Sequence, residues 1–297
     1  MPTKPPSLMI ALLSLALVLP LAARASSSVG DKEVPRSKTF GGDCTKCELS
    51  GRMMHGAHFM NANFAGATLV GSDLREAHFI ASSFVGADLT HANLSDSQII
   101  AADFTDAILA HAKLRDAQTV GSRFNNATLS GADFSDATAQ GTDFNQAQLI
   151  GTLFRSTELS GAHFERVIAR DADFRNATMH AAVLTYGRFE RASFRAAALD
   201  GAVLMGADFE GADFRDASLK RASIAGADLS RARGLTQHQI DEACGDSHTR
   251  LPHGLTARLC SGREAHIMTS PHVRLIPAIP APPGPPAPPY RYWVAPV

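Results

Sequence analysis

Large apolar residues recur at every fifth position along most of this chain. In the stretch from residue 57 to 86, "AHFMNANFAGATLVGSDLREAHFIASSFVG", a small residue also stands two places before each large one. The large residues of this stretch are Phe59, Phe64, Leu69, Leu74, Phe79 and Phe84. We call the large residue of each group of five the centre. Centres continue without a break from Leu49 to Leu229, and fifteen of the sixteen Phe residues occupy them.

A period of five fits neither a straight helix nor a straight strand. A helix turns by about 100° per residue, so this pattern would spread apolar side chains around its whole surface. An odd period also alternates between the two faces of a strand. Residues two apart do share a face locally, so the pattern predicts a short extended step followed by a corner. Gly two places after many centres, as at Gly66, Gly71 and Gly86, marks that corner.

Similar residues also recur at a spacing of twenty. One column of centres consists of Phe64, Phe84, Phe104, Phe124, Phe144 and Phe164. Such a column is expected when each residue stacks on its counterpart one coil away. Four groups of five therefore form one roughly square coil. About nine coils at a strand spacing of about 4.8 Å give a rod about 45 Å long.

The units "ANFAG", "ADLTH", "ADFSD", "AQLIG", "GADFE" and "GADLS" resemble the A(D/N)LxG repeats of the pentapeptide-repeat family. The resemblance covers about residues 47–233 and implies an all-β fold, a right-handed quadrilateral β-helix. Thr119, Ala139 and Ala169 are undersized centres, and the unit "VIARD" departs most because Val167 fills a small position. We expect a thin or slightly distorted core in this third quarter of the rod.

The N-terminal segments predict an exported protein. Residues 1–25 have the features of a cleaved signal peptide, namely a basic Lys4, an apolar stretch over 8–23 and an "ARA" cleavage site that ends at Ala25. An uncleaved anchor is the alternative. Residues 26–43 are polar and rich in turn formers and are expected to form a flexible leader before a β-helix at 44–233. The mature chain is expected in the periplasm or outside the cell, without a transmembrane span.

Four cysteines lie outside the repeats or at their edge: Cys44, Cys47, Cys244 and Cys260. An even number of cysteines in an exported chain favours disulfides. Proximity in sequence favours the pairs Cys44–Cys47 and Cys244–Cys260, although three pairings are possible. The CxxC motif also fits a redox pair or half a metal site. No second CxxC and no thioredoxin-like pattern accompanies it, which favours the structural interpretation.

Residues 234–262 are predicted to cap the C-terminal end of the rod. Thr236 and Gln239 have the spacing of a capping box at the start of a helix, and Gly245 is expected to end that helix. Leu235, Ile240 and Ala243 would cover the last coil. Residues 263–297 form a Pro-rich tail that is expected to be disordered or extended as polyproline II. The candidate anchor for a partner is the aromatic end of this tail: Tyr290, Tyr292 and Trp293.

A row of arginines directly follows one column of centres and begins with Arg75 and Arg115. Early in this row, we expect Glu76, Asp96, Asp116 and Asp136 to neutralise the arginines. Acids beside the row become scarcer later, although Asp173 and Asp213 can compensate part of the charge. The candidate anion-binding stripe is therefore Arg155, Arg175, Arg195 and Arg215. The alternative is a solvated row of weak ion pairs.

Two pairs of histidines also recur at a spacing of twenty, His58 with His78 and His91 with His111. Two imidazoles without a third ligand make a poor metal site, so we expect neither a metal nor a cofactor. The sequence contains no GxSxG, HExxH or phosphate-cradling motif. Asp and Asn recur as part of the repeat unit, which indicates a structural role. These observations predict that the protein is not an enzyme.

The favoured hypothesis is an exported scaffold or protein-binding rod that acts through one face or through its tail on an unidentified protein or envelope partner. The resemblance implies a second hypothesis, a DNA-mimicking protein that binds topoisomerase. A formal net charge of −1 and the export signal disfavour it, and they disfavour nucleic acid as a partner. A thiol redox protein that uses Cys44 and Cys47 is a third hypothesis. The resemblance also implies a possible homodimer through the C-terminal cap.

Overall fold

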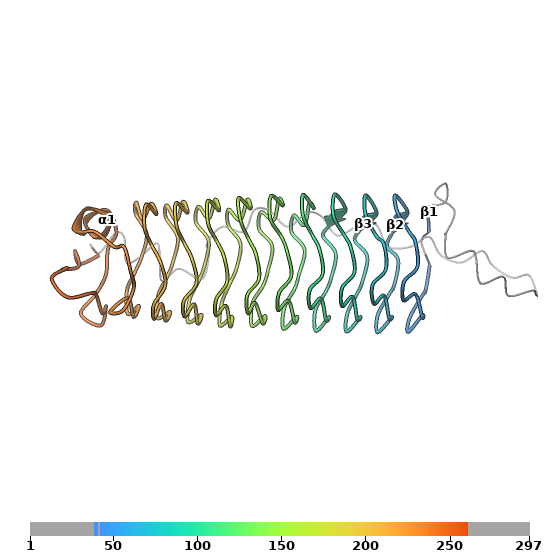
Figure 1. Cartoon of the computed structure of the whole chain (residues 1–297), viewed down its shortest axis with the longest axis horizontal. Helices are drawn as coiled ribbons and strands as arrows, with labels where there is room; N and C mark the ends of the chain where they lie inside the picture. The colour runs from blue at the N-terminus through green and yellow to red at the C-terminus, as the bar shows by residue number, and fades with distance from the viewer. Residues whose placement is uncertain (1–38, 41, 261–297) are drawn as a thin grey trace, which may run out of the picture. The chain divides into compact units, whose positions relative to one another are not determined.

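The computed structural model describes residues 39–40 and 42–260. The described residues wind into stacked coils, each about the same size as the next (Figure 1). Parallel bridges join residues that are twenty apart, from Asp43 with Asn63 to Asp213 with Arg233. Four groups of five residues therefore complete one coil, and the fold is the right-handed quadrilateral β-helix that the sequence predicts.

The corners are tight turns with a left-handed residue. In a typical corner, the N–H of Ala67 donates to the carbonyl oxygen of Phe64 over 3.0 Å, and Gly66 between them has a φ of 63°. A positive φ at the third residue is the requirement of a type II turn. The second residue after the centre has a positive φ at every corner from Lys46 to Gly226, and more than half of these residues are not glycine. The inter-coil ladder therefore imposes this backbone conformation even where the residue type does not favour it.

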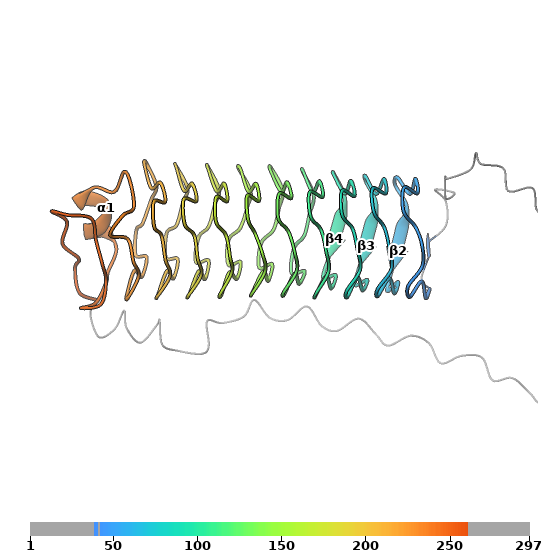
Figure 2. The same cartoon turned by 60° about the horizontal axis from the view of Figure 1, so that its bottom comes forward.

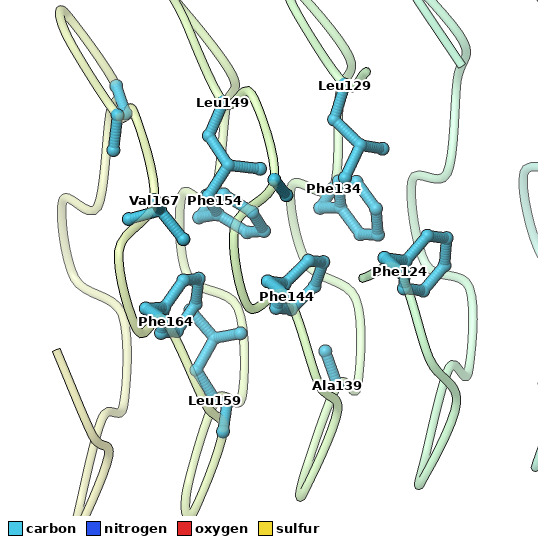
Figure 3. Close-up of a cluster of buried hydrophobic side chains, with 14 of the residues drawn as sticks. Phe124, Leu129, Phe134, Ala139, Phe144, Leu149, Phe154, Leu159, Phe164 and Val167 are labelled. Atoms are coloured by element: carbon cyan, nitrogen blue, oxygen red, sulfur yellow. The ribbon is translucent and has the colours of Figure 1, made fainter. Parts of the chain in front are cut away.

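The centres and the small residues fill the interior of the rod. Phe columns run along the axis, and successive rings in the column from Phe64 to Phe164 stack with centroids 4.6–5.3 Å apart. The column that contains Phe134 and Phe154 meets this one edge to face, and the ring centroids of Phe144 and Phe154 lie 5.5 Å apart. Figure 3 labels both side chains in the core. Each fully buried Phe or Leu contributes on the order of 1.5–3 kcal/mol before the cost of ordering it.

Four short strands form a parallel sheet in the order β1-β2-β3-β4 at the N-terminal end of the rod. They are β1 (Thr39–Phe40), β2 (His58–Met60), β3 (His78–Ile80) and β4 (Gln98–Ile100). Strands β2 to β4 lie side by side on one face (Figure 2). Strand β1 pairs with β2 at a spacing of nineteen, so that Phe40 lies opposite Phe59. Ordered structure thus begins before Cys44, and the leader predicted for 26–43 extends too far.

The undersized centres do not interrupt the ladder. Thr119, Ala139 and Ala169 are fully buried, and so is Val167. The spacing of twenty continues through this region, for example from Gln148 to Ile168 and on to Arg188. The expected thinning is therefore confined to the side chains and does not change the register of the coils.

A short helix, α1 (Gln237–Glu242), covers the C-terminal end of the core. Thr236 caps it, and the predicted capping box with Gln239 is present. Ile240 and Ala243 are buried against the last coil, and Leu235 packs beside them partly buried. Gly245 does not end the helix, because Ala243 is already extended with a φ of −93° and a ψ of 175°. The chain turns away there because Cys244 continues the ladder by pairing with Ser223.

Candidate functional site

The recurrent acids directly before the centres stabilise the corners. Their Oδ1 atoms accept a hydrogen bond from the backbone N–H two residues later, as Asp88 does from Thr90 over 2.9 Å and Asp143 does from Asn145 over 3.0 Å. This is the local bond by which Asp and Asn favour turns. The Asp or Asn of the repeat unit therefore has a structural role in these corners.

The arginine row is paired with acids on its own face. Arg175 contacts Asp173 through two nitrogens, at 2.8 and 2.7 Å, and Arg155 reaches the same carboxylate from the previous coil at 2.5 Å. Arg215 is likewise held by Asp213. Of the four arginines of the candidate stripe, only Arg195 has no ion pair within the described residues. The four arginines of the stripe thus share two carboxylates, so about half of their charge is compensated, and anion binding by the stripe stays a prediction.

The partners of the earlier arginines differ from those that the sequence suggested. Arg75 pairs with Asp73 at 2.7 Å and Arg115 pairs with Asp133 at 3.1 Å, whereas the expected partners were the corner acids Glu76 and Asp116. The residues before and after a centre are two apart and share a face. A corner acid follows the arginine directly and is turned away by the left-handed backbone. The corner acids therefore stay largely without ion pairs.

Asp173 and Asp213 are the most buried carboxylates of this face, with 8% and 6% of their surfaces exposed. Burial raises the pKa of the Asp173 carboxyl, but the hydrogen bonds from Arg175 and Arg155 outweigh this effect and hold the pKa below its ordinary value. Asp173 is therefore a negatively charged clamp between two coils at neutral pH.

The histidine pairs stack on one another as the spacing predicts. The ring centroids of His58 and His78 lie 4.2 Å apart, and those of His91 and His111 lie 5.2 Å apart with an interplanar angle of 12°. The rings of His58 and His78 are tilted by 34°, whereas those of His91 and His111 are nearly parallel, so that their in-plane lone pairs do not converge on one metal ion. Burial lowers the pKa of His78, and the neighbouring His58 lowers it further. Among the described residues, no group of three or more metal-binding side chains lies close together.

All four cysteines form disulfides. Cys44 is bonded to Cys47, and Cys244 is bonded to Cys260. These are the pairs that proximity in sequence favours. One disulfide lies in the first coil, and the other ties the chain after α1 back to the last rung of the ladder.

A surface that the sequence analysis did not single out lies over β2, β3 and β4. It has an apolar row directly after one column of centres, and we call it the apolar row: Met60, Ile80, Ile100 and Val120. Met60 is 46% exposed and the other three are partly exposed. The four residues recur at a spacing of twenty, as the Phe columns do. Their side chains point outward, whereas those of the Phe columns point into the core.

Comparisons with known proteins agree with this architecture. Family models described as "Pentapeptide repeat region" and "Pentapeptide repeats (8 copies)" match residues 57–134 and residues 120–156, 157–195 and 197–233. The chain belongs to the pentapeptide-repeat family. A comparison with curated protein sequences found no match.

Among solved structures, this pentapeptide-repeat protein is similar to HetL, a pentapeptide repeat protein involved in heterocyst differentiation regulation from the cyanobacterium Nostoc sp. strain PCC 7120. The identity is 27%, the TM-score is 0.57, and the match covers 66% of this chain and 85% of HetL. QnrB1, a plasmid-mediated fluoroquinolone resistance protein, matches with 19% identity and a TM-score of 0.41 over 63% of this chain and 92% of QnrB1. A protein of the Arabidopsis thaliana thylakoid lumen matches with 25% identity and a TM-score of 0.19 over 39% of this chain and 70% of its own.

The concave features of this pentapeptide-repeat protein are shallow and charged. One depression of about 580 Å³ lies between α1 and the last full coil and is lined by Arg215, Lys220, His238 and Glu242 among others. A second, of about 380 Å³, lies among Arg170, Glu190, Glu210 and Arg231. Ser218 and Thr236 also line the first depression, where the Ser218 hydroxyl donates to Asp200 and the Thr236 hydroxyl donates to Gln239.

Two features that the sequence predicts lie in parts of the chain that the structure does not describe. The signal peptide with its cleavage after Ala25 and the aromatic residues Tyr290, Tyr292 and Trp293 lie outside the described residues. Within the part of the chain that the structure describes, no helix is long and apolar enough to cross a membrane, and α1 has six residues.

Proposed function

We propose that this protein is an exported, non-catalytic rod that binds a protein partner through a face of the β-helix or through its C-terminal tail. The observation that carries the proposal is the surface of the rod, which consists of rows of repeated side chains. Such rows offer extended, regular contact surfaces of the kind that solenoids use for binding. The acids of the repeat unit are engaged in corners and ion pairs, as Asp88 and Asp173 are.

Disulfides support the exported location, because they persist in oxidising compartments. The first test is the intact mass of the protein purified from its native host without reductant. We expect a chain that begins at Ser26 and is lighter by four hydrogens than the fully reduced form. A full-length mass with four free thiols would contradict export.

A partner is sought separately, by crosslinking in the native host. A photoreactive residue placed at Ile80, on the apolar row, is compared with one at Ile150, which is 39% exposed on a different face. We expect a protein partner to crosslink to the probe on only one of these faces, or to crosslink only when residues 263–297 are present. If the crosslinking yield is the same for both probes and does not change when the tail is removed, the proposal of a specific binding surface is contradicted.

The charge pattern argues against the DNA-mimicking alternative. A DNA mimic needs an extended negative strip, and the face of Arg155 and Arg175 does not form one, because arginines alternate with acids there. The exposed acids Glu76, Asp96, Asp116 and Asp136 form a single row, and Arg75 and Arg115 directly precede two of them. If the intact mass contradicts export, inhibition of topoisomerase supercoiling becomes the next measurement.

A further inference from the structure

The apolar row differs from exposed apolar residues elsewhere on the rod, such as Ile108 and Ile150, because it continues over four successive coils. Between residues 58 and 121, the face that carries β2, β3 and β4 presents only uncharged side chains, with His58, His78, Gln98 and Gln118 beside the apolar row. The corner after the row is small and uncharged as well, with Ala81 and Ala101 at two successive coils. An aliphatic surface of four successive coils is therefore open to solvent in the described structure.

A row of acids borders the other edge of the same face. These residues are the corner acids, and we call them the acidic row: Glu76, Asp96, Asp116 and Asp136. All four are exposed. Glu76 lies 3.4 Å from His55, whereas Asp96, Asp116 and Asp136 have no ion pair within the described residues. The face thus combines an apolar edge with a negative edge on which three of the four acids have no ion pair within the described residues.

We propose that the C-terminal tail of the same chain docks on this face, with Tyr290, Tyr292 and Trp293 against the apolar row and Arg291 toward the acidic row. The inference goes beyond the proposed binding role, because it assigns an intramolecular occupant to a surface that an external partner would otherwise use. Its failure leaves the intact-mass and crosslinking tests unaffected.

Charge complementarity favours this occupant. Residues 261–297 contain Arg263, Arg274 and Arg291 against a single acid, Glu264. Residues 42–140 contain six Lys and Arg residues against eleven Asp and Glu residues. A basic tail is therefore attracted to the N-terminal half of the rod. Tyr and Trp side chains supply large contact areas with few rotatable bonds, and a Pro-rich chain loses little conformational freedom on docking.

The length of the tail allows the contact. The Cys244–Cys260 disulfide fixes the chain before the tail at the C-terminal end of the rod. Tyr290 follows Cys260 by thirty positions, and in polyproline II this length of chain spans about 90 Å. At about 4.8 Å per coil, the apolar row lies about six to nine coils away, which corresponds to about 29–43 Å. The aromatic end can reach every residue of the row with chain to spare.

The sequence provides its own reporter for this contact, because Trp293 is the only Trp of the chain. The test measures tryptophan emission and its quenching by acrylamide in the full chain and in three variants. Ile80→Lys places a charge in the apolar row, and Arg291→Glu reverses the charge opposite the acidic row. Ile150→Lys is the matched control, because Ile80 and Ile150 both directly follow a centre and are both solvent-accessible.

We expect the wild-type protein and Ile150→Lys to emit at shorter wavelength than the urea-unfolded chain and to be protected from acrylamide. Ile80→Lys and Arg291→Glu are expected to lose both the shift and the protection while they keep the circular dichroism spectrum of the wild type. Solvent-like emission from the folded wild-type protein would overturn the proposal. So would equal losses in Ile80→Lys and Ile150→Lys. A shift that disappears on dilution would assign the face to the tail of a second copy and overturn docking within one chain.

Discussion

Val167 lies directly over Gly187, the residue one coil further along the rod. A Cβ atom built at Gly187 would lie 3.2 Å from Cγ2 of Val167 and 2.5 Å from Cε2 of Phe189. The two coils have opposite size patterns, since a bulky Val167 precedes the small centre Ala169 and Gly187 precedes the large centre Phe189. The missing Cβ of Gly187 leaves room for both the valine and the ring. The unit that departs most from the repeat is thus compensated by its neighbour (Figure 3 shows Val167 in the interior).

Gly187→Ala is expected to destabilise the protein by about 1–3 kcal/mol, because the added methyl group overpacks the site between Val167 and Phe189. The measurement is the free energy of unfolding in urea. Val167→Ala removes one of the two clashing groups, so the double variant is expected to lose less than the sum of the two single losses. Additive losses would show that Val167 and Gly187 do not share this space.

The core of this fold can be predicted from the sequence because one rule repeats along the chain. The period of five places each side chain inside or outside, and the spacing of twenty places it above its counterpart, so Phe64 and Phe84 had to stack. Strand β1 was not predicted, because Thr39 and Phe40 lie before the repeats and two residues are too few to show a period. The prediction that Gly245 ends the helix was wrong, because the chain leaves the helix earlier so that Cys244 can pair with Ser223 of the last coil. That pairing is a contact between residues far apart in sequence, which local sequence signals do not reveal.

The surface is less predictable than the core, because several partners lie within reach of each side chain. Arg75 has Asp73 and Glu76 as close neighbours in sequence, and only the backbone conformation at Glu76 decides in favour of Asp73. The apolar row is predictable from its spacing of twenty, because Met60, Ile80, Ile100 and Val120 all directly follow a centre of one column. Whether such a row is covered depends on residues beyond the repeats.

Two substitutions at corners test the cost of the left-handed backbone. Gly151 has a φ of 63°, and a Cβ there would meet no atom within 4 Å, so Gly151→Ala changes little except the backbone preference. We expect a loss of about 1 kcal/mol. Ala196 has a φ of 53° at an equivalent corner, and Ala196→Gly is expected to gain up to about 1 kcal/mol, because relief of strain exceeds the added flexibility of the unfolded chain. Urea denaturation of both variants checks these signs, and two changes of the same sign would contradict them.

The buried hydroxyl groups of the small positions are expected to differ in importance. Ser122 Oγ donates to the carbonyl of Ile99 over 2.7 Å and accepts from the N–H of Ala102 over 3.1 Å. Ser122→Ala leaves two buried backbone groups without this partner and is expected to cost about 1–3 kcal/mol. Ser72 is the control, because its buried hydroxyl has no hydrogen-bond partner among the described residues, and Ser72→Ala is expected to be neutral or stabilising. Thermal unfolding of the two variants measures the difference, and equal losses would exclude the hydrogen bonds as its cause.

The clamp formed by Asp173 predicts a specific dependence of stability on pH. The hydrogen bonds from Arg175 and Arg155 hold the folded-state pKa of Asp173 below its unfolded value of about 3.9. Such a group stabilises the fold fully above the unfolded pKa, and the contribution is lost as the pH falls through the folded pKa. Asp173→Asn should therefore lower the urea midpoint at pH 7, and its difference from the wild type should shrink at pH 3.

Asp96→Asn is the matched control for this measurement, since Asp96 has no ion pair among the described residues and Asn tolerates the same left-handed corner. We expect it to change the midpoint much less than Asp173→Asn at pH 7. A difference between wild type and Asp173→Asn that persists unchanged at pH 3, below the unfolded pKa, would mean that the side chain acts through packing, because a contribution from the lowered pKa shrinks in that range.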